Sequence, residues 1–145
     1  MATPPESGVT DLDSPNLEGL DRWAVEPRRV EKPWGWELIW ADTELYVGKI
    51  LWLRAGFSLS LQFHNEKDES WYVESGKGTL ELGDVGQAVL ITEVIGAGAC
   101  FRYRPGTVHR VTALEDLTIL EVSTPHLDDV VRLEDAYGRA GTSEP

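Results

Sequence analysis

The chain has 145 residues, of which 41% are hydrophobic and 26% are charged, as expected for one globular domain with its own core. The formal net charge of −12 disfavours nucleic-acid binding, because phosphate backbones would be repelled. Cys100 is the only cysteine, which excludes an intrachain disulfide, and we find neither a signal-peptide pattern nor an apolar run long enough to span a bilayer. We therefore expect a cytoplasmic protein with a small-molecule substrate and no nucleic-acid or membrane partner.

Residues 1–27 are rich in Pro, Ser, Gly, Asp and Glu and show little periodicity. This composition predicts a flexible N-terminal arm, followed by one domain over residues 28–145 with a C-terminal extension. Leu17, Leu20 and Trp23 are apolar side chains that could attach the arm to the domain or to a second subunit.

From residue 33 onward, short apolar or alternating runs are separated by Gly-rich and Asn/Asp-rich turns, which predicts antiparallel strands. The predicted strands are 34–40, 45–53, 58–64, 70–74, 79–82, 88–92, 99–104, 109–113 and 118–122. Strands this closely spaced are typical of an all-β sandwich or barrel. Residues 127–137 fit either a short helix or an extended arm.

Four side chains suggest a metal site. Gln62 and His64 are two residues apart on a predicted strand, so they point to the same face. Glu69 opens the next strand after a short turn, and His109 begins a later one. An amide oxygen, two imidazoles and a carboxylate suit zinc, manganese, iron, cobalt or nickel.

These residues resemble the first motif of the cupin superfamily. The matching positions are Gly56, Gln62, His64, Glu69 and Gly76, with Gln62 in place of the first histidine of the motif. The resemblance implies a cupin fold, a double-stranded β-helix that forms a jelly-roll barrel.

A second cupin motif is matched by Gly98, Gly106 and His109. Arg104 stands where this motif has proline, and Ala113 where it often has asparagine. Because the two motifs occur in the correct order, they support each other far more than a lone histidine would.

Longer segments resemble the cupin domain of type II phosphomannose isomerases, over roughly residues 31–139. They are KPWG at 32–35, LSLQFH at 59–64, PGTVHR at 105–110 and DDVVRLEDAYGR at 128–139. The resemblance implies one divalent metal ion, with zinc expected first, and a homodimer. It also implies that the ion is bound by Gln62, His64, Glu69 and His109. Asn65 and Glu66 depart from the family, which often has histidines there.

Other candidate residues each have a simpler structural explanation. Lys49 resembles a lysine that these isomerases carry before the Gln-x-His strand, and could bind substrate oxygen or phosphate or lie on the surface. Arg104 and Arg110 could bind an anion or form surface ion pairs. Glu121 could act as a general base or pair with an arginine. We expect Cys100 to be a buried apolar residue.

The expected chemistry is activation of a substrate carbonyl for enolisation. This serves aldose–ketose isomerisation of a sugar phosphate and also aldol-type cyclisation of a polyketide, as in small cupins that resemble this chain. The side chains that should face inward with Gln62 and His64 predict a mostly apolar pocket, which favours a cyclase. They are Ser58, Ser60, Trp71, Val73 and Val111. Two alternatives are an iron-dependent dioxygenase and a non-catalytic metal- or sugar-binding module.

Overall fold

The computed structural model describes residues 16–141, and between them the chain forms strands, turns and loops without a helix. In chain order the strands are β1 (Arg28–Lys32), β2 (Gly35–Asp42), β3 (Val47–Leu53), β4 (Leu61–Phe63), β5 (Glu69–Ser75), β6 (Lys77–Asp84), β7 (Ile91–Gly96), β8 (Cys100–Tyr103), β9 (Thr107–Ala113), β10 (Leu117–Ser123) and β11 (Val131–Glu134). No helix in this part of the chain is long and apolar enough to cross a membrane.

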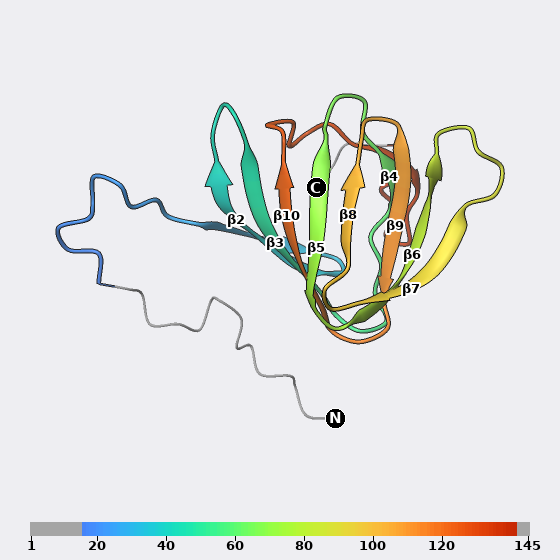
Figure 1. Cartoon of the computed structure of the whole chain (residues 1–145), viewed down its shortest axis with the longest axis horizontal. Helices are drawn as coiled ribbons and strands as arrows, with labels where there is room; N and C mark the ends of the chain where they lie inside the picture. Colours follow the sequence, from blue (N-terminus) through green and yellow to red (C-terminus); the bar gives the residue numbers. More distant parts are fainter. Residues whose placement is uncertain (1–15, 142–145) are drawn as a thin grey trace.

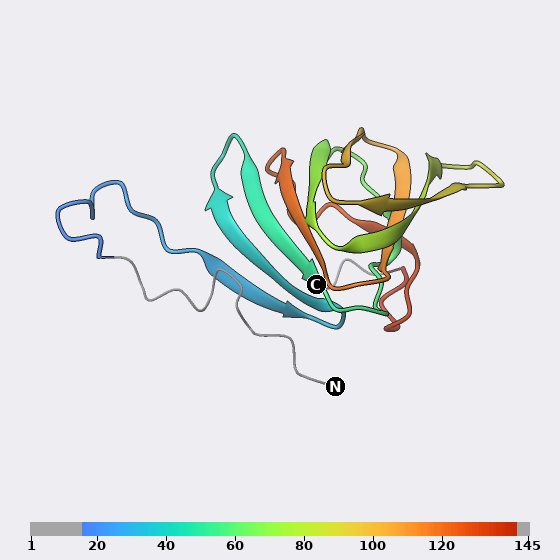
Figure 2. The ribbon, with the colours of Figure 1, turned by 60° about the horizontal axis from the view of Figure 1, so that its bottom comes forward.

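The strands form two antiparallel sheets that curve around a common interior (Figures 1 and 2). One has six strands in the order β1-β2-β3-β10-β5-β8, and the other has five in the order β11-β4-β9-β6-β7. At one end the interior is filled by an apolar core that includes Leu53, Val73, Val111, Leu117 and Ile119. The polar side chains described below occupy the other part of the interior. The all-β expectation is confirmed.

The register of the six-stranded sheet places three functional side chains in one row. Lys49 on β3 lies opposite Glu121 on β10, and Glu121 lies opposite Trp71 on β5. Directly opposed residues of a sheet point to the same face, so all three side chains face the interior.

The five-stranded sheet supplies a second row, which faces the first. Gln62 on β4 lies opposite Arg132 on β11 and opposite His109 on β9. The turn before β9 is held close to the β4 end by Gly106, whose N–H donates to the carbonyl of His64 over 2.9 Å. Gly106 has a φ of 84°, a conformation that favours glycine.

Several predictions about local structure need correction. The run 88–92 was expected to be a strand, but β7 is shifted to Ile91–Gly96, because 88–90 belong to the loop that follows β6. The ambiguous segment 127–137 contains no helix: its residues Val131–Glu134 form β11, with turns at 127–128 and 136–137, and β1 was not expected. Cys100 is exposed on β8 instead of buried. Of the expected arm, residues 16–27 contain turns and no strand; residues 1–15, and 142–145 of the C-terminal extension, lie outside the described part.

Candidate metal site and adjoining cavity

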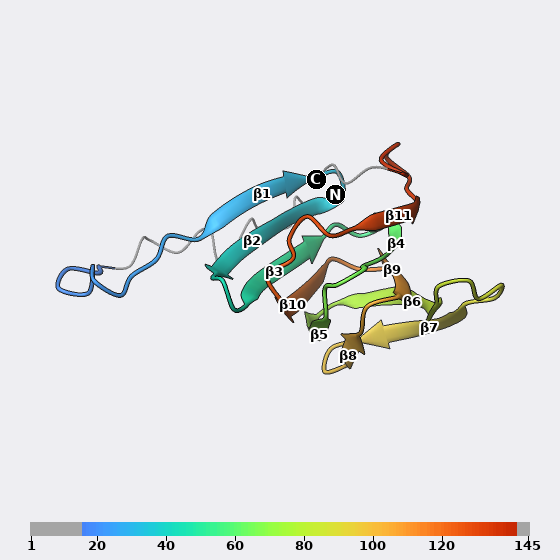
Figure 3. The same ribbon diagram turned by 90° about the horizontal axis from the view of Figure 1, so that it is seen from above.

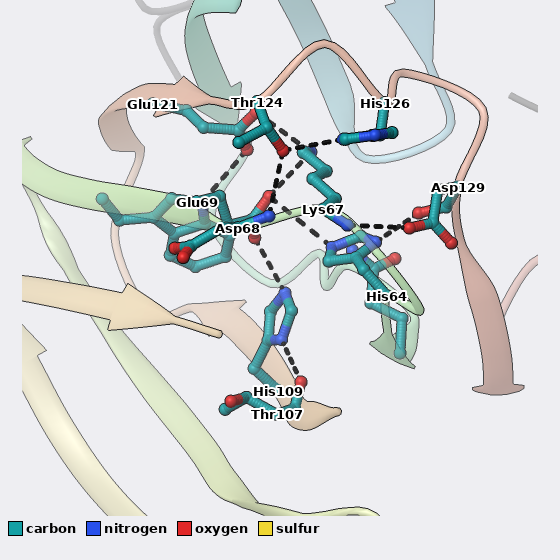
Figure 4. A network of polar contacts seen from close by, with 12 residues as sticks. His64, Lys67, Asp68, Glu69, Thr107, His109, Glu121, Thr124, His126 and Asp129 are labelled. Carbon is teal, nitrogen blue, oxygen red and sulfur yellow. Dashed lines mark hydrogen bonds and ion pairs between the residues drawn. The ribbon is translucent and has the colours of Figure 1, made fainter. Parts of the chain in front are cut away.

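His64, Glu69 and His109 are fully buried and converge on one point between the two sheets (Figure 4). Nε2 of His109 lies 3.0 Å from Oε1 of Glu69, and Nε2 of His64 lies 3.5 Å from Oε2 of the same carboxylate. One donor atom from each of the three residues lies within 4.8 Å of the others, which is close enough for all of them to contact a single ion. The three residues thus form a candidate His/Glu/His metal site.

The hydrogen bonds of the two histidines orient each ring so that its unprotonated Nε2 points toward this site. Nδ1 of His109 donates to the carbonyl of Thr107 over 3.0 Å, and Nδ1 of His64 donates to the carbonyl of Asp129. In neutral imidazoles this leaves both Nε2 atoms as acceptors. Both Nε2 atoms and Oε1 of Glu69 lack a hydrogen-bond partner in the described structure. Acceptors that face acceptors in a buried site fit a cation between them.

Lys67 is a buried cation beside the same carboxylate. Its Nζ lies 2.7 Å from Oε2 of Glu69 and 3.2 Å from Oε2 of Glu121. Burial alone would lower the pKa of Lys67, but the two carboxylates raise it above its usual range. Burial would likewise raise the pKa of Glu69, but the charge of Lys67 holds it well below its usual value. Glu69 is therefore an anion in the folded protein.

Aromatic rings fix the orientation of the second histidine. The ring of Tyr103 stacks on His109 with centroids 4.2 Å apart and an interplanar angle of 8°. Trp71 meets His109 edge-on at 5.6 Å. Burial, together with the charges of Glu69 and Glu121, raises the pKa of Tyr103 above its usual range. The phenol is therefore neutral and serves as a packing wall for the imidazole.

Asp129 holds the loop that connects the first histidine to Glu69 (Figure 4). Its carboxylate accepts hydrogen bonds from the backbone N–H groups of Asn65, Glu66 and Lys67 at 3.0, 2.6 and 2.8 Å. Burial would raise the pKa of Asp129, but these N–H donors and His64 lower it. The backbone carbonyl of Asp129 also accepts the hydrogen bond from Nδ1 of His64. Asp129 therefore fixes both the conformation of the loop and the orientation of the His64 ring.

A cavity of about 370 Å³ adjoins the metal-binding residues and is lined by residues of both sheets. Besides Lys67, its lining includes four largely buried cations, which are Lys32, Lys49, Arg132 and Arg139. Glu37 lies 3.3 Å from Lys49 and 3.7 Å from Lys32. The expectation of a mostly apolar pocket was wrong, because strands β1, β3 and β11 add charged side chains that projection from one strand could not include.

Five of the predicted site residues beyond the three buried ligands line this cavity; they are Lys49, Ser60, Gln62, Trp71 and Glu121. The hydroxyl of Ser60 donates to Oε1 of Gln62 over 2.7 Å, which leaves a second lone pair on that oxygen. The indole of Trp71 donates to Oε1 of Glu121 over 3.1 Å. The structure thus brings the amide, the carboxylate and the lysine around one space.

Of the residues predicted to act in catalysis or substrate binding, three do not line the cavity. Arg110 follows the ligand His109 on the strand and so points to the opposite face, where it pairs with Glu81 and Glu134. Val111 faces inward but is part of the apolar core. Arg104 is exposed in the turn between β8 and β9. The alternation of side chains along β9 directs Arg110 away from the cavity, and the depth of Val111 within the barrel places it in the apolar core.

Sequence reasoning missed five residues that the structure places at the site. These are Lys32, Lys67, Asp129, Arg132 and Arg139. Lys67 had a signal, since it lies inside the first motif between two predicted ligands. The others lie in 32–35 and 128–139, segments that carried the family resemblance but had no role assigned.

Comparison with known proteins gives a consistent family and fold. A family model described as mannose-6-phosphate isomerase C-terminal matches residues 21–135. The xanthan biosynthesis protein XanB of Xanthomonas campestris pv. campestris (strain B100) is 35% identical over 118 residues, which cover 77% of this chain and 24% of XanB. The chain thus spans about a quarter of the length of this curated relative.

Two solved structures share the fold at low sequence identity. The capsular polysaccharide assembling protein CapF from Staphylococcus aureus aligns with a TM-score of 0.64 and 17% identity, over 81% of this chain and 35% of CapF. Oxalate decarboxylase of Bacillus subtilis, described with Mn(II) centres, aligns with a TM-score of 0.62 and 21% identity, over 73% and 30%. Both are cupins, as the sequence motifs implied.

Proposed function

The chain belongs to the mannose-6-phosphate isomerase C-terminal family, and from this premise we propose that it is a metal-dependent aldose–ketose isomerase of a phosphorylated sugar. The observation that carries the proposal is the buried His64–Glu69–His109 cluster beside a cavity that His64 lines together with several cations. Such a cavity can hold a carbonyl beside the metal ligands and an anionic group beside the cations.

The proposed ligands are His64, Glu69 and His109, with Gln62 as the fourth through the free lone pair of its side-chain oxygen. Zinc is the ion that we propose first, and manganese is the alternative that the Mn(II) centres of a cupin neighbour support. When bound, a divalent ion would polarise the substrate carbonyl and so acidify the adjacent C–H group.

Glu121 is the proposed proton carrier. It is buried on β10, lines the cavity, and has each oxygen oriented by a separate donor, Trp71 on one side and Lys67 on the other. The carboxylate takes the proton from C2 of the aldose as that C–H bond breaks and its electron pair forms the C1–C2 double bond. It then returns a proton to C1, while the hydroxyl proton passes from O2 to O1, so that the ketose has the same atoms as the aldose.

The cations that line the cavity support a phosphorylated substrate. Lys32, Lys49, Arg132 and Arg139 gather in a protein with a net charge of −12. Burial, together with the other three cations, lowers the pKa of Lys32, while Glu37 opposes this shift. A dianionic phosphate would relieve this mutual repulsion and would accept bidentate hydrogen bonds from guanidinium groups.

The alternatives have less support. Polyketide cyclisation depended on an apolar pocket, which the charged lining does not provide. An iron-dependent dioxygenase predicts oxygen uptake with the loaded protein. A binding module predicts that a sugar phosphate binds without proton exchange at C2.

The proposal is tested by metal analysis and by NMR of mannose 6-phosphate incubated with the metal-loaded protein in D2O. We expect about one ion per chain and formation of fructose 6-phosphate with deuterium at the exchanging carbon. His64→Ala and His109→Ala should lose the ion, whereas His126→Ala is the matched control, because its only described ion pair is with the exposed Glu66. A full metal complement with neither product nor deuterium exchange would overturn the isomerase proposal.

A further inference from the structure

We propose that Glu37 recognises a hydroxyl group of the substrate and makes the cavity selective for the open-chain form of a phosphorylated sugar. This inference rests on the proposed function, which gives roles to the metal ligands, to Glu121 and to the cations but leaves Glu37 without one. Glu37 is 7% exposed and lines the cavity. It is therefore a buried carboxylate in contact with the space that the substrate would occupy.

The position of Glu37 follows from the alternation of side chains along β2. Glu37 and Ile39 line the cavity, whereas Leu38 between them points to the outer face of the sheet. Seen from above, β2 and β3 lie on one side of the interior, and β4 and β11 lie on the other (Figure 3). Arg132 on β11 lines the same cavity, so a ligand there meets Glu37 from one sheet and a guanidinium from the other.

Two lysines hold the carboxylate of Glu37, one at each oxygen. Nζ of Lys49 lies 3.3 Å from Oε2, and Nζ of Lys32 lies 3.7 Å from Oε1. A carboxylate has about four lone-pair sites, so each oxygen keeps one for a further donor from the cavity. The lysines therefore fix the carboxylate without saturating it.

The chemistry of a carboxylate restricts what this further donor can be. A carboxylate only accepts hydrogen bonds, and so does a phosphate dianion, so Glu37 repels the phosphate itself. A sugar hydroxyl, by contrast, can donate to it. If the cavity served only to bind an anion, Glu37 would weaken it by offsetting one of the positive charges of Lys32 and Lys49. A site that binds a phosphate together with a neighbouring hydroxyl accounts for both signs of charge.

The two lysines also indicate which hydroxyl this is. Lys32 and Lys49 are among the proposed phosphate-binding cations, so a phosphate in contact with either one brings the adjoining part of the sugar close to Glu37. In a hexose 6-phosphate, C5 is the carbon next to the phosphorylated one. Its oxygen carries a proton only in the open chain, because it closes the ring in mannopyranose 6-phosphate and in fructofuranose 6-phosphate. Glu37 would therefore favour the form on which enolisation takes place over both rings.

The test measures the binding of unreactive ligands to the metal-loaded protein by calorimetry. Mannitol 1-phosphate is an open chain with a hydroxyl next to the phosphorylated carbon, and the comparison ligand is its deoxy analogue without that hydroxyl. We expect the wild-type chain to bind mannitol 1-phosphate at least about tenfold more tightly, because the analogue loses a hydrogen bond to a charged group. 1,5-Anhydromannitol 6-phosphate, whose ring cannot open, should bind at least about tenfold more weakly than mannitol 1-phosphate for the same reason.

Glu37→Gln should lower the preference for mannitol 1-phosphate over its deoxy analogue to about threefold or less, because a neutral amide makes a weaker hydrogen bond than a carboxylate. A purely structural role of Glu37 would change the affinity for both ligands equally and leave their ratio intact. Glu31→Gln is the matched control, because the side chain of Glu31 is 72% exposed and pairs with Arg29. The control should keep the wild-type ratio.

The comparison of ligands on the wild-type chain decides the matter even if Glu37→Gln fails to fold. Equal binding of mannitol 1-phosphate and its deoxy analogue would overturn the role of Glu37 and leave the isomerase proposal in place. A preference that survives Glu37→Gln unchanged would do the same. If none of the phosphorylated ligands binds, the role of Glu37 is overturned together with the proposal of a phosphorylated substrate.

Discussion

Nε1 of Trp71 donates a hydrogen bond to Oε1 of Glu121 over 3.1 Å, and the two residues lie directly opposite each other on β5 and β10. The sheet register therefore positions the proposed proton carrier, because the donor cannot move along the strand without breaking the ladder. Both side chains are buried, so the bond is made away from bulk water.

Trp71→Phe should keep the ring and remove the donor. We expect turnover of mannose 6-phosphate to fall about tenfold, since one oxygen of Glu121 loses the group that orients it, and the free energy of unfolding to fall by about 1 kcal/mol. Steady-state kinetics and urea denaturation measure the two effects. Unchanged turnover would show that the indole does not orient the carboxylate.

Glu121→Gln should remove the proton carrier while it preserves shape. We expect turnover and deuterium exchange at C2 to fall at least about a hundredfold, with metal content unchanged. Glu81→Gln is the control, because Glu81 pairs with Arg110 outside the cavity. If Glu121→Gln retains normal exchange, another group moves the proton.

Asp129→Ala should weaken both the fold and the metal site. The variant loses the acceptor of three backbone N–H groups, so we expect the free energy of unfolding to fall by about 1–3 kcal/mol. The loop that carries the first ligand would be less well fixed, so metal affinity should fall by about 10–100-fold. Competition with a chelator measures that affinity, and a loss of stability without any loss of affinity would show that the loop alone depends on Asp129.

Arg132→Gln should raise KM for mannose 6-phosphate by at least about tenfold, because a charged hydrogen bond to phosphate would be lost. Exchange at C2 of unphosphorylated mannose should not change. Arg110→Gln is the matched control, since that guanidinium pairs with Glu81 and Glu134 outside the cavity. Equal effects of Arg132→Gln on both sugars would argue against a phosphate site beside Arg132.

Asp135 provides a pH-dependent contribution to stability. Burial would raise the pKa of Asp135, but hydrogen bonds from Arg139 at 2.7–3.1 Å lower it below the ordinary value. The ion pair therefore stabilises the fold above the ordinary aspartate pKa, and this contribution is lost as the pH falls through the lower, folded-state value. Asp135→Asn should lower stability at neutral pH, and its deficit should shrink as the pH falls below the ordinary aspartate pKa. Asp42→Asn, which alters an exposed pair with Arg28, should show a smaller deficit.

The sequence by itself was sufficient for the fold class and for the proposed metal ligands. Alternating strands and Gly-rich turns determine an all-β protein through local chemistry. The ligands His64 and Glu69 are close in the chain, so a strand and a turn bring them together. His109 is 40 or more residues away in the sequence, but its motif indicated that it belongs to the same site.

Only the tertiary structure decided which charges surround that site. Lys32 and Arg132 are 100 residues apart and come from edge strands of different sheets, so no local pattern places them in one cavity. Register likewise decides that Arg110 points away, although it follows a ligand directly. Local periodicity determines which side chains share a face of a strand, whereas the packing of two curved sheets determines which faces meet.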